Sequence, residues 1–131
     1  MTRQIALLRG INLGARRRVA MPDLRELLAG ARCLLFPIDW EEPFGLVAIE
    51  ALACGTPVAA FARGALPEIL DERSGTLARP DDAADLARQI GRARRLSRVA
   101  CRRRAERRFS LVAMTDRYLD AYRSLLGRGR A

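Results

Sequence analysis

One stretch, residues 34–61, constrains the fold of this chain most strongly, and it reads LLFPIDWEEPFGLVAIEALACGTPVAAF. Its first three residues are apolar, which predicts a short buried strand. Pro37 ends that strand, because proline has no N–H to donate within a sheet. Residues 44–54 are apolar almost all round, which predicts a helix buried on most sides. Gly55 predicts the end of that helix, and residues 58–61 predict a second strand. A strand, a helix and a strand in this order indicate a parallel α/β sheet.

Two glutamates distinguish this stretch from an ordinary strand and helix. Glu42 lies just before the predicted helix and Glu50 lies inside it, where an isolated charge costs on the order of several kcal/mol. Glu50 must therefore face a cleft, pair with an arginine or accept hydrogen bonds. At the helix start, the helix dipole and the unpaired backbone amides suit a phosphate. These amides belong to Phe44, Gly45 and Leu46. Carboxylates accept hydrogen bonds from vicinal hydroxyls, so the combination predicts a site for a sugar nucleotide.

The same segment carries a family resemblance. WEEPFGLVAIEALACGTPVAAFARGALPEIL resembles the donor-site signature of family 4 glycosyltransferases of the GT-B fold, because the E-x7-E pair, the intervening FG and the later G-x-PV are in register. GARCLLFP, SGTLARPDDAADLARQI and RRFSLVAMTDRYLDAYRSLL resemble the same C-terminal domain, so the resemblance covers about residues 24–126. It implies that Glu50 binds the ribose hydroxyls and that Glu42, as the catalytic residue, contacts the transferred sugar. The diphosphate would meet the amides of Phe44, Gly45 and Leu46.

The ordinary alternative for these carboxylates is structural. Glu42 and Glu50 would then only interact with the helix dipole and with surrounding arginines. Trp40 is likewise more often packed at the rim of a core than stacked on a sugar.

The resemblance also implies a reaction. A complete relative transfers a glycosyl group from a nucleotide sugar to an acceptor hydroxyl, usually with retention, and uses neither a metal nor another cofactor. A GT-B enzyme needs two facing domains, whereas 131 residues make one small domain. The family's diphosphate clamp and the acceptor domain belong to the first half, so we expect weak or no transfer by this chain alone. The base, the sugar and the acceptor are not predicted.

The implied fold is the C-terminal half of a Rossmann-like domain. Such a sheet has the strand order 3-2-1-4-5-6 with helices on both faces, and only strands 4 to 6 are expected here. Residues 24–131 would form this partial nucleotide-sugar-binding domain. Its first strand would have an unpaired edge that favours homo-oligomers, unless a strand from the N-terminal segment covers it.

Residues 1–30 resemble a different family. They open with ALLRGIN, a glycine turn, basic residues and an M-x-DLR pattern, as do members of an uncharacterised bacterial family of small α/β proteins. We expect a strand at about residues 4–8, a helix from Pro22 and a junction between the two families at residues 23–31. A third functional possibility is therefore the unknown function of that N-terminal family.

Further elements are expected after the central stretch. A short helix begins near Pro67, and a strand follows at residues 75–78. A helix begins at about Asp81, residues 92–108 form an arginine-rich helical stretch, and Ser110 caps a final helix.

The charge supports an alternative of another class. The net charge is +9, and all 24 basic residues are arginine. A non-enzymatic basic module would bind polyanions through eight arginines, which are Arg94, Arg95, Arg98, Arg102, Arg103, Arg104, Arg107 and Arg108. No aromatic residues interleave with them as stacking platforms, so we expect no specific nucleic acid and only salt-dependent attraction. A solvated helix surface is the simpler interpretation.

The cysteines and apolar runs bear on location. Cys33, Cys54 and Cys101 are odd in number and lack a CxxC pair, which favours reduced thiols. The apolar run at residues 5–8 is too short for a signal peptide, and no run reaches the length of a membrane span. We therefore expect a cytoplasmic protein with no transmembrane segment.

Overall fold

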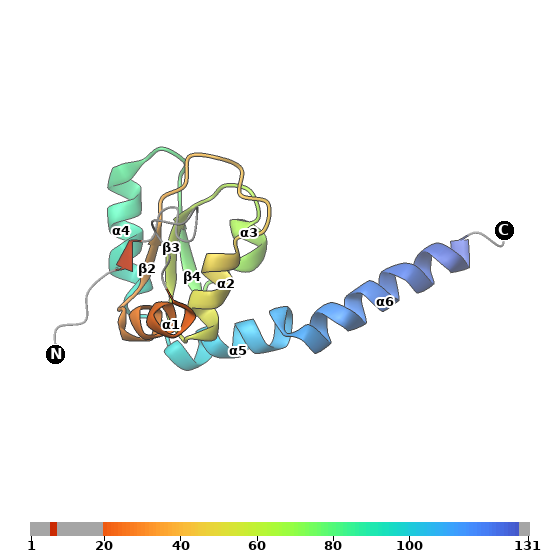
Figure 1. Ribbon diagram of the computed structural model, residues 1–131. Coiled ribbons are helices and arrows are strands. Elements are labelled where there is room, and N and C mark those ends of the chain that lie inside the picture. Colours follow the sequence, from red (N-terminus) through yellow and green to blue (C-terminus); the bar gives the residue numbers. More distant parts are fainter. Residues whose placement is uncertain (1–5, 8–19, 129–131) are drawn as a thin grey trace.

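Within residues 6–7 and 20–128, which the computed structural model describes, the backbone forms a four-stranded parallel sheet with helices on both faces (Figure 1). The strands are β1 Ala6–Leu7, β2 Leu34–Phe36, β3 Val58–Phe61 and β4 Gly75–Ala78. The helices are α1 Met21–Gly30, α2 Leu46–Ala53, α3 Leu66–Ile69, α4 Ala83–Ala93, α5 Arg98–Phe109 and α6 Leu111–Arg128. The predicted α/β class is confirmed.

The central strand β3 is buried on both of its faces. Val58 and Ala60 pack into a core formed with α1, α2, α3 and α5, whereas Ala59 and Phe61 pack on the opposite face against α4. This alternation follows from the two-residue period of a strand. A strand covered on both faces must be apolar throughout, as residues 58–61 are.

The strand order agrees with half of a Rossmann-like sheet. β2, β3 and β4 are neighbours in chain order, as expected for strands 4 to 6. β1 pairs in parallel with β2, Ala6 opposite Leu34 and Leu7 opposite Leu35, so the N-terminal segment does cover this edge. The rest of the predicted strand at residues 4–8 lies outside the described residues. Association of copies through a sheet edge stays a prediction.

Two helix predictions were wrong in their bounds. The helix expected at residues 44–54 begins only at Leu46, because Gly45 takes a left-handed conformation, and Phe44 and Leu46 are 70% and 64% exposed instead of buried. The arginine-rich stretch at residues 92–108 is two helices instead of one. α4 ends at Ala93, and the Ser97 hydroxyl accepts the N–H of Ala100 to cap α5.

Arg98 and Arg104 fasten the helices of one face. The Arg98 guanidinium donates to the carbonyl oxygens of Ala29 and Ala31, at 2.7 and 2.8 Å, and to the Thr56 hydroxyl at 3.0 Å. Arg104 donates to the carbonyls of Glu68 and Ile69 and pairs with Asp71. Two of the eight arginines assigned to a basic module therefore hold the fold together, which weakens that alternative.

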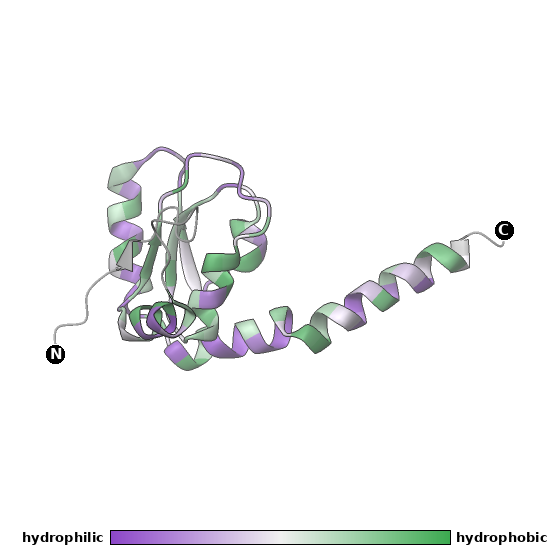
Figure 2. Ribbon diagram, viewed as in Figure 1, coloured by the Kyte–Doolittle hydropathy of each residue, from purple (hydrophilic) through white to green (hydrophobic). Residues whose placement is uncertain are grey.

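The last helix, α6, extends away from the sheet (Figure 1). As expected, the Ser110 hydroxyl caps it by accepting the N–H of Ala113 at 3.2 Å. Figure 2 shows apolar and polar residues interspersed along α6, and large apolar side chains on it are exposed. These are Leu111, Val112, Met114, Tyr118, Leu119, Tyr122, Leu125 and Leu126.

Candidate functional site

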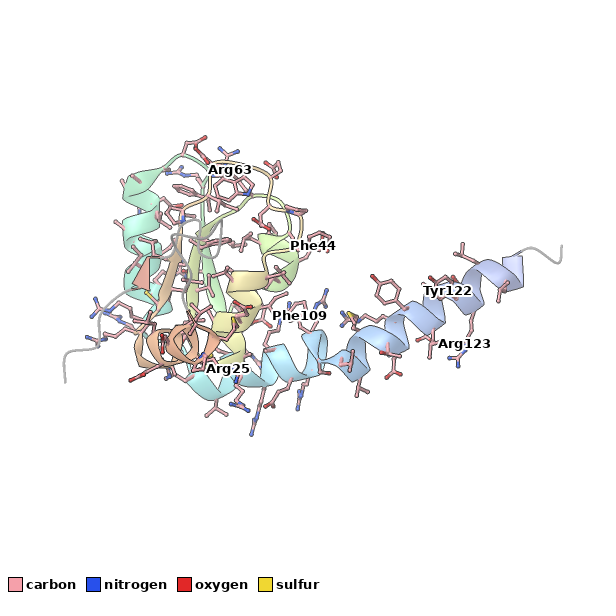
Figure 3. All side chains as sticks on the ribbon, in the orientation of Figure 1. Arg25, Phe44, Arg63, Phe109, Tyr122 and Arg123 are labelled. Carbon is pink, nitrogen blue, oxygen red and sulfur yellow. The ribbon has the colours of Figure 1, made fainter. Side chains whose placement is uncertain are left out.

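The candidate site lies where the chain passes from β2 into α2. This loop, residues 37–45, follows the carboxyl end of a parallel strand, which is where open α/β sheets bind their ligands. All five residues named from the sequence lie in this loop or in α2. Phe44 points outward from the domain in Figure 3, whereas Gly45 is buried.

Gly45 sets the geometry of the helix start. Its φ of +60° is a left-handed conformation that favours glycine, and a Cβ added there would overlap the side chain of Ile69. The backbone N–H groups of Phe44 and Gly45, just before α2, both donate to Glu42 in this loop. α2 then begins, and the carbonyl oxygen of Gly45 accepts the N–H groups of Ala48 and Ile49.

The Glu42 carboxylate occupies this helix start. Its Oε1 accepts the N–H of Gly45 at 3.1 Å and the N–H of Phe44 at 3.4 Å. Its Oε2 accepts the indole N–H of Trp40 at 3.1 Å. Burial opposes ionisation of this carboxyl, but the bonds from Gly45, Trp40 and Phe44 outweigh it and lower the pKa of Glu42. The start of α2 therefore holds an anion, which is one of the protein's own carboxylates.

Glu50 lies two turns further along α2 and is half-buried. Within the described residues its carboxylate has no hydrogen-bond or ion-pair partner, so the pairing with arginine that the sequence allowed is not found there. Trp40 is exposed, and its indole N–H donates a hydrogen bond to Glu42. This contact explains the position of the Trp40 side chain without a bound sugar.

A second loop contacts the Glu42 loop, and sequence reasoning missed its role. It comprises residues 62–65 after β3. The N–H of Gly64 donates to Glu41 Oε2 at 2.5 Å, and the N–H of Ala65 donates to the carbonyl of Glu42 at 2.8 Å. Arg63 pairs with Glu41 at 3.6 Å. The only signal of this contact in the sequence was the glycine in the turn after β3.

The described residues contain neither a cluster of metal ligands nor a membrane-spanning helix. No three histidine, cysteine, aspartate or glutamate side chains in that part of the chain are grouped to hold a metal ion. None of the helices described is both long and apolar enough to cross a bilayer.

Comparison with known proteins identifies relatives of this fold and loop. The family model for glycosyl transferases group 1 matches residues 3–95. D-inositol 3-phosphate glycosyltransferases of Mycobacterium tuberculosis and Mycobacterium bovis are 39% identical over 115 residues, which is 80% of this chain and 23% of those proteins. The chain thus spans about a quarter of the length of these relatives. The match begins within residues 1–30, and the division of the chain between two families stays a prediction.

Solved structures show the same relationship. Sucrose-phosphate synthase from Thermosynechococcus elongatus superposes with a TM-score of 0.67 and 34% identity over 85% of this chain and 29% of that one. HepE of Anabaena, solved in complex with UDP, superposes with a TM-score of 0.67 and 25% identity over 78% of this chain and 30% of that one. The family match covers well over half of the sequence. The chain therefore belongs to the glycosyl transferases group 1 family and corresponds to the C-terminal part of a GT-B glycosyltransferase.

Proposed function

We propose that this chain carries the nucleotide-sugar half of a glycosyltransferase donor site. The reaction of the complete site is transfer of a glycosyl group from a nucleotide-diphosphate sugar to an acceptor hydroxyl. The donor is a substrate, and no cofactor is required. The reduced thiols and the donor chemistry both suit the cytoplasm, where we place the protein.

The observation that carries this proposal is the anion held at the start of α2. The amides of Phe44 and Gly45 converge on one carboxylate oxygen of Glu42, and a helix start with such amides is equally suited to a phosphate oxygen. That HepE was solved with UDP supports the same ligand class for this chain.

Binding of a diphosphate at these amides requires an exchange of anions. The Glu42 carboxylate must leave the N–H groups before a phosphate oxygen can accept their hydrogen bonds, because each amide has one proton to donate. The released carboxylate then becomes available to the hydroxyls of the transferred sugar. Glu42 would thus cap the empty site and contact the sugar in the occupied one.

The remaining roles follow the positions on α2. The amide of Leu46, which has no side-chain acceptor among the described residues, completes the diphosphate site with Phe44 and Gly45. Glu50 accepts hydrogen bonds from the vicinal ribose hydroxyls, and its lack of a described protein partner leaves its oxygens available for them. A carboxylate can accept hydrogen bonds from both hydroxyls of a ribose at once.

The isolated chain should bind a nucleotide more readily than it turns one over. An acceptor-binding surface and further groups on the diphosphate are expected from the part of the relatives that this chain does not span. Transition-state stabilisation depends on such groups being fixed around the reacting atoms. Weak or no transfer by the chain alone is therefore part of the proposal.

Titration calorimetry with UDP, GDP and ADP tests this function. One nucleotide should bind saturably, and Glu50→Gln should weaken it by about tenfold because a charged hydrogen-bond acceptor is lost. Glu26→Gln, on the exposed surface of α1, is the matched control and should bind as the parent does. A folded protein that binds none of the three nucleotides would contradict the proposal.

A further inference from the structure

Three loops at the carboxyl end of the sheet are tied together through Arg63. It follows β3, and its guanidinium pairs with Glu41 at 3.6 Å in the loop after β2 and with Asp81 at 2.5 Å in the loop after β4. Figure 3 shows Arg63 among these loops. The Arg63 side chain is 20% exposed, whereas both carboxylates are 72% exposed. The Arg63 guanidinium is therefore the less exposed partner in both ion pairs.

The backbone of the Arg63 loop also touches the Glu42 loop directly. Gly64 has a φ of +51°, and a Cβ added there would overlap the backbone of Glu42. The Gly64 and Ala65 N–H groups donate to the Glu41 side chain and to the Glu42 carbonyl. Such contact leaves no room for another residue type at Gly64.

The conformation of the loop after β4 supports the same arrangement. Asp81 has a φ of +61° and is the one non-glycine residue with a positive φ in the part of the chain that the structure describes. Aspartate tolerates this conformation better than most residues, and here it directs the carboxylate to Arg63. An exposed ion pair alone contributes little to stability, so the three contacts matter for position more than for free energy.

We infer that Arg63 is a positioning residue for Glu42. Arg63 holds Glu41, and Glu41 with the Gly64 amide fixes the turn that places the Glu42 carboxylate over the amides of Phe44 and Gly45. This inference rests on the proposed function only in its consequence for the nucleotide. The placement of Glu42 depends on contacts within the protein and can be measured without any ligand.

Trp40 supplies that measurement, because it is the only tryptophan and its indole donates to Glu42. Arg63→Met should shift the Trp40 emission and increase its quenching by acrylamide, and should weaken nucleotide binding by roughly tenfold. Arg104→Met is the matched control. It removes an arginine that anchors α5 to α3, so it should lower the melting temperature and leave the Trp40 signal of the folded protein unchanged.

The outcomes separate the two proposals. A changed Trp40 signal in Arg63→Met, with no nucleotide bound by the parent, would support the positioning role and overturn the proposed function. An unchanged Trp40 signal together with parental nucleotide affinity would overturn the positioning role. If Arg63→Met gives no cooperative melt, Asp81→Asn removes one partner of Arg63 and should move Trp40 in the same direction by less. No change in that variant, with Glu41→Gln also unchanged, would then contradict the inference.

Discussion

The carboxylate of Glu42 accepts the backbone N–H of Gly45 at 3.1 Å, so the helix start that the sequence assigned to a phosphate already holds an anion. Capping of this kind satisfies amides that have no partner within a helix. A nucleotide at the proposed site would have to compete with the Glu42 carboxylate for the N–H of Gly45.

Gly45→Ala should destabilise the fold by about 1–3 kcal/mol, because alanine is strained at a positive φ and its Cβ would displace Ile69. Chemical denaturation measures this change. Gly91→Ala is the control, since Gly91 lies in α4 with open space around it. This variant should raise the free energy of unfolding by about 0.5–1 kcal/mol. Equal stabilities for the two variants would show that Gly45 does not hold the conformation described.

Asp71 should make stability depend on pH in the acid range. Burial raises its pKa, but the Ser74 hydroxyl, Arg104 and two backbone N–H groups outweigh this and lower the pKa below the ordinary value of 3.8. A lowered pKa adds stability that is complete above pH 3.8 and is lost as the pH falls through the folded value. The difference in melting temperature between the parent and Asp71→Asn should therefore shrink below about pH 4. A difference that stays constant down to pH 2 would contradict this assignment.

The three cysteines should differ in reactivity while the protein is folded. Cys33 and Cys101 are buried, and burial raises the pKa of the Cys101 thiol to about 11, whereas Cys54 is only half-buried. At pH 8 about one Cys101 thiol in a thousand is ionised, and the thiolate is the reacting form. Iodoacetamide should modify Cys54 first, as peptide mass spectrometry would show. Modification of Cys101 at the rate of Cys54 would mean that α5 does not pack as described.

Arg98→Met should destabilise the fold by about 2–4 kcal/mol, because it leaves the carbonyls of Ala29 and Ala31 without their charged donor. Arg103→Met, an exposed neighbour on α5, should change stability by no more than about 0.5 kcal/mol. Urea denaturation of both variants measures the difference. Equal stabilities of the two variants would contradict the anchoring role of Arg98 and would favour a surface role, as in a polyanion-binding module.

Much of the fold follows from local signals. Apolar runs next to a proline or a glycine mark β2 and β3, and β3 is apolar throughout because a strand buried on both faces has no polar positions. Ser110 marked the start of α6 in the same way, through the capping chemistry of its hydroxyl. The break between α4 and α5 was missed because arginine favours helices, although Ser97 caps α5 through the same hydroxyl chemistry.

The candidate site was only partly predictable. The spacing of Glu42 and Glu50 identified the loop and the helix, but it could not show that Glu42 itself caps the amides of Gly45 and Phe44. The position of Arg63 depends on three loops that are distant in sequence and meet only in the folded sheet. A sequence pattern carries no information about such a meeting point until the strand order is known.

The most direct test follows the amide resonances of Gly45 and Phe44 in ¹⁵N-labelled protein during titration with UDP, GDP and ADP. We expect one nucleotide to shift these two resonances saturably and more than those of α5, because its phosphate replaces the Glu42 carboxylate on the amides. The same titration of Glu50→Gln should need about ten times more nucleotide. Saturable binding that leaves Gly45 and Phe44 unmoved while the α5 resonances shift would contradict the central claim.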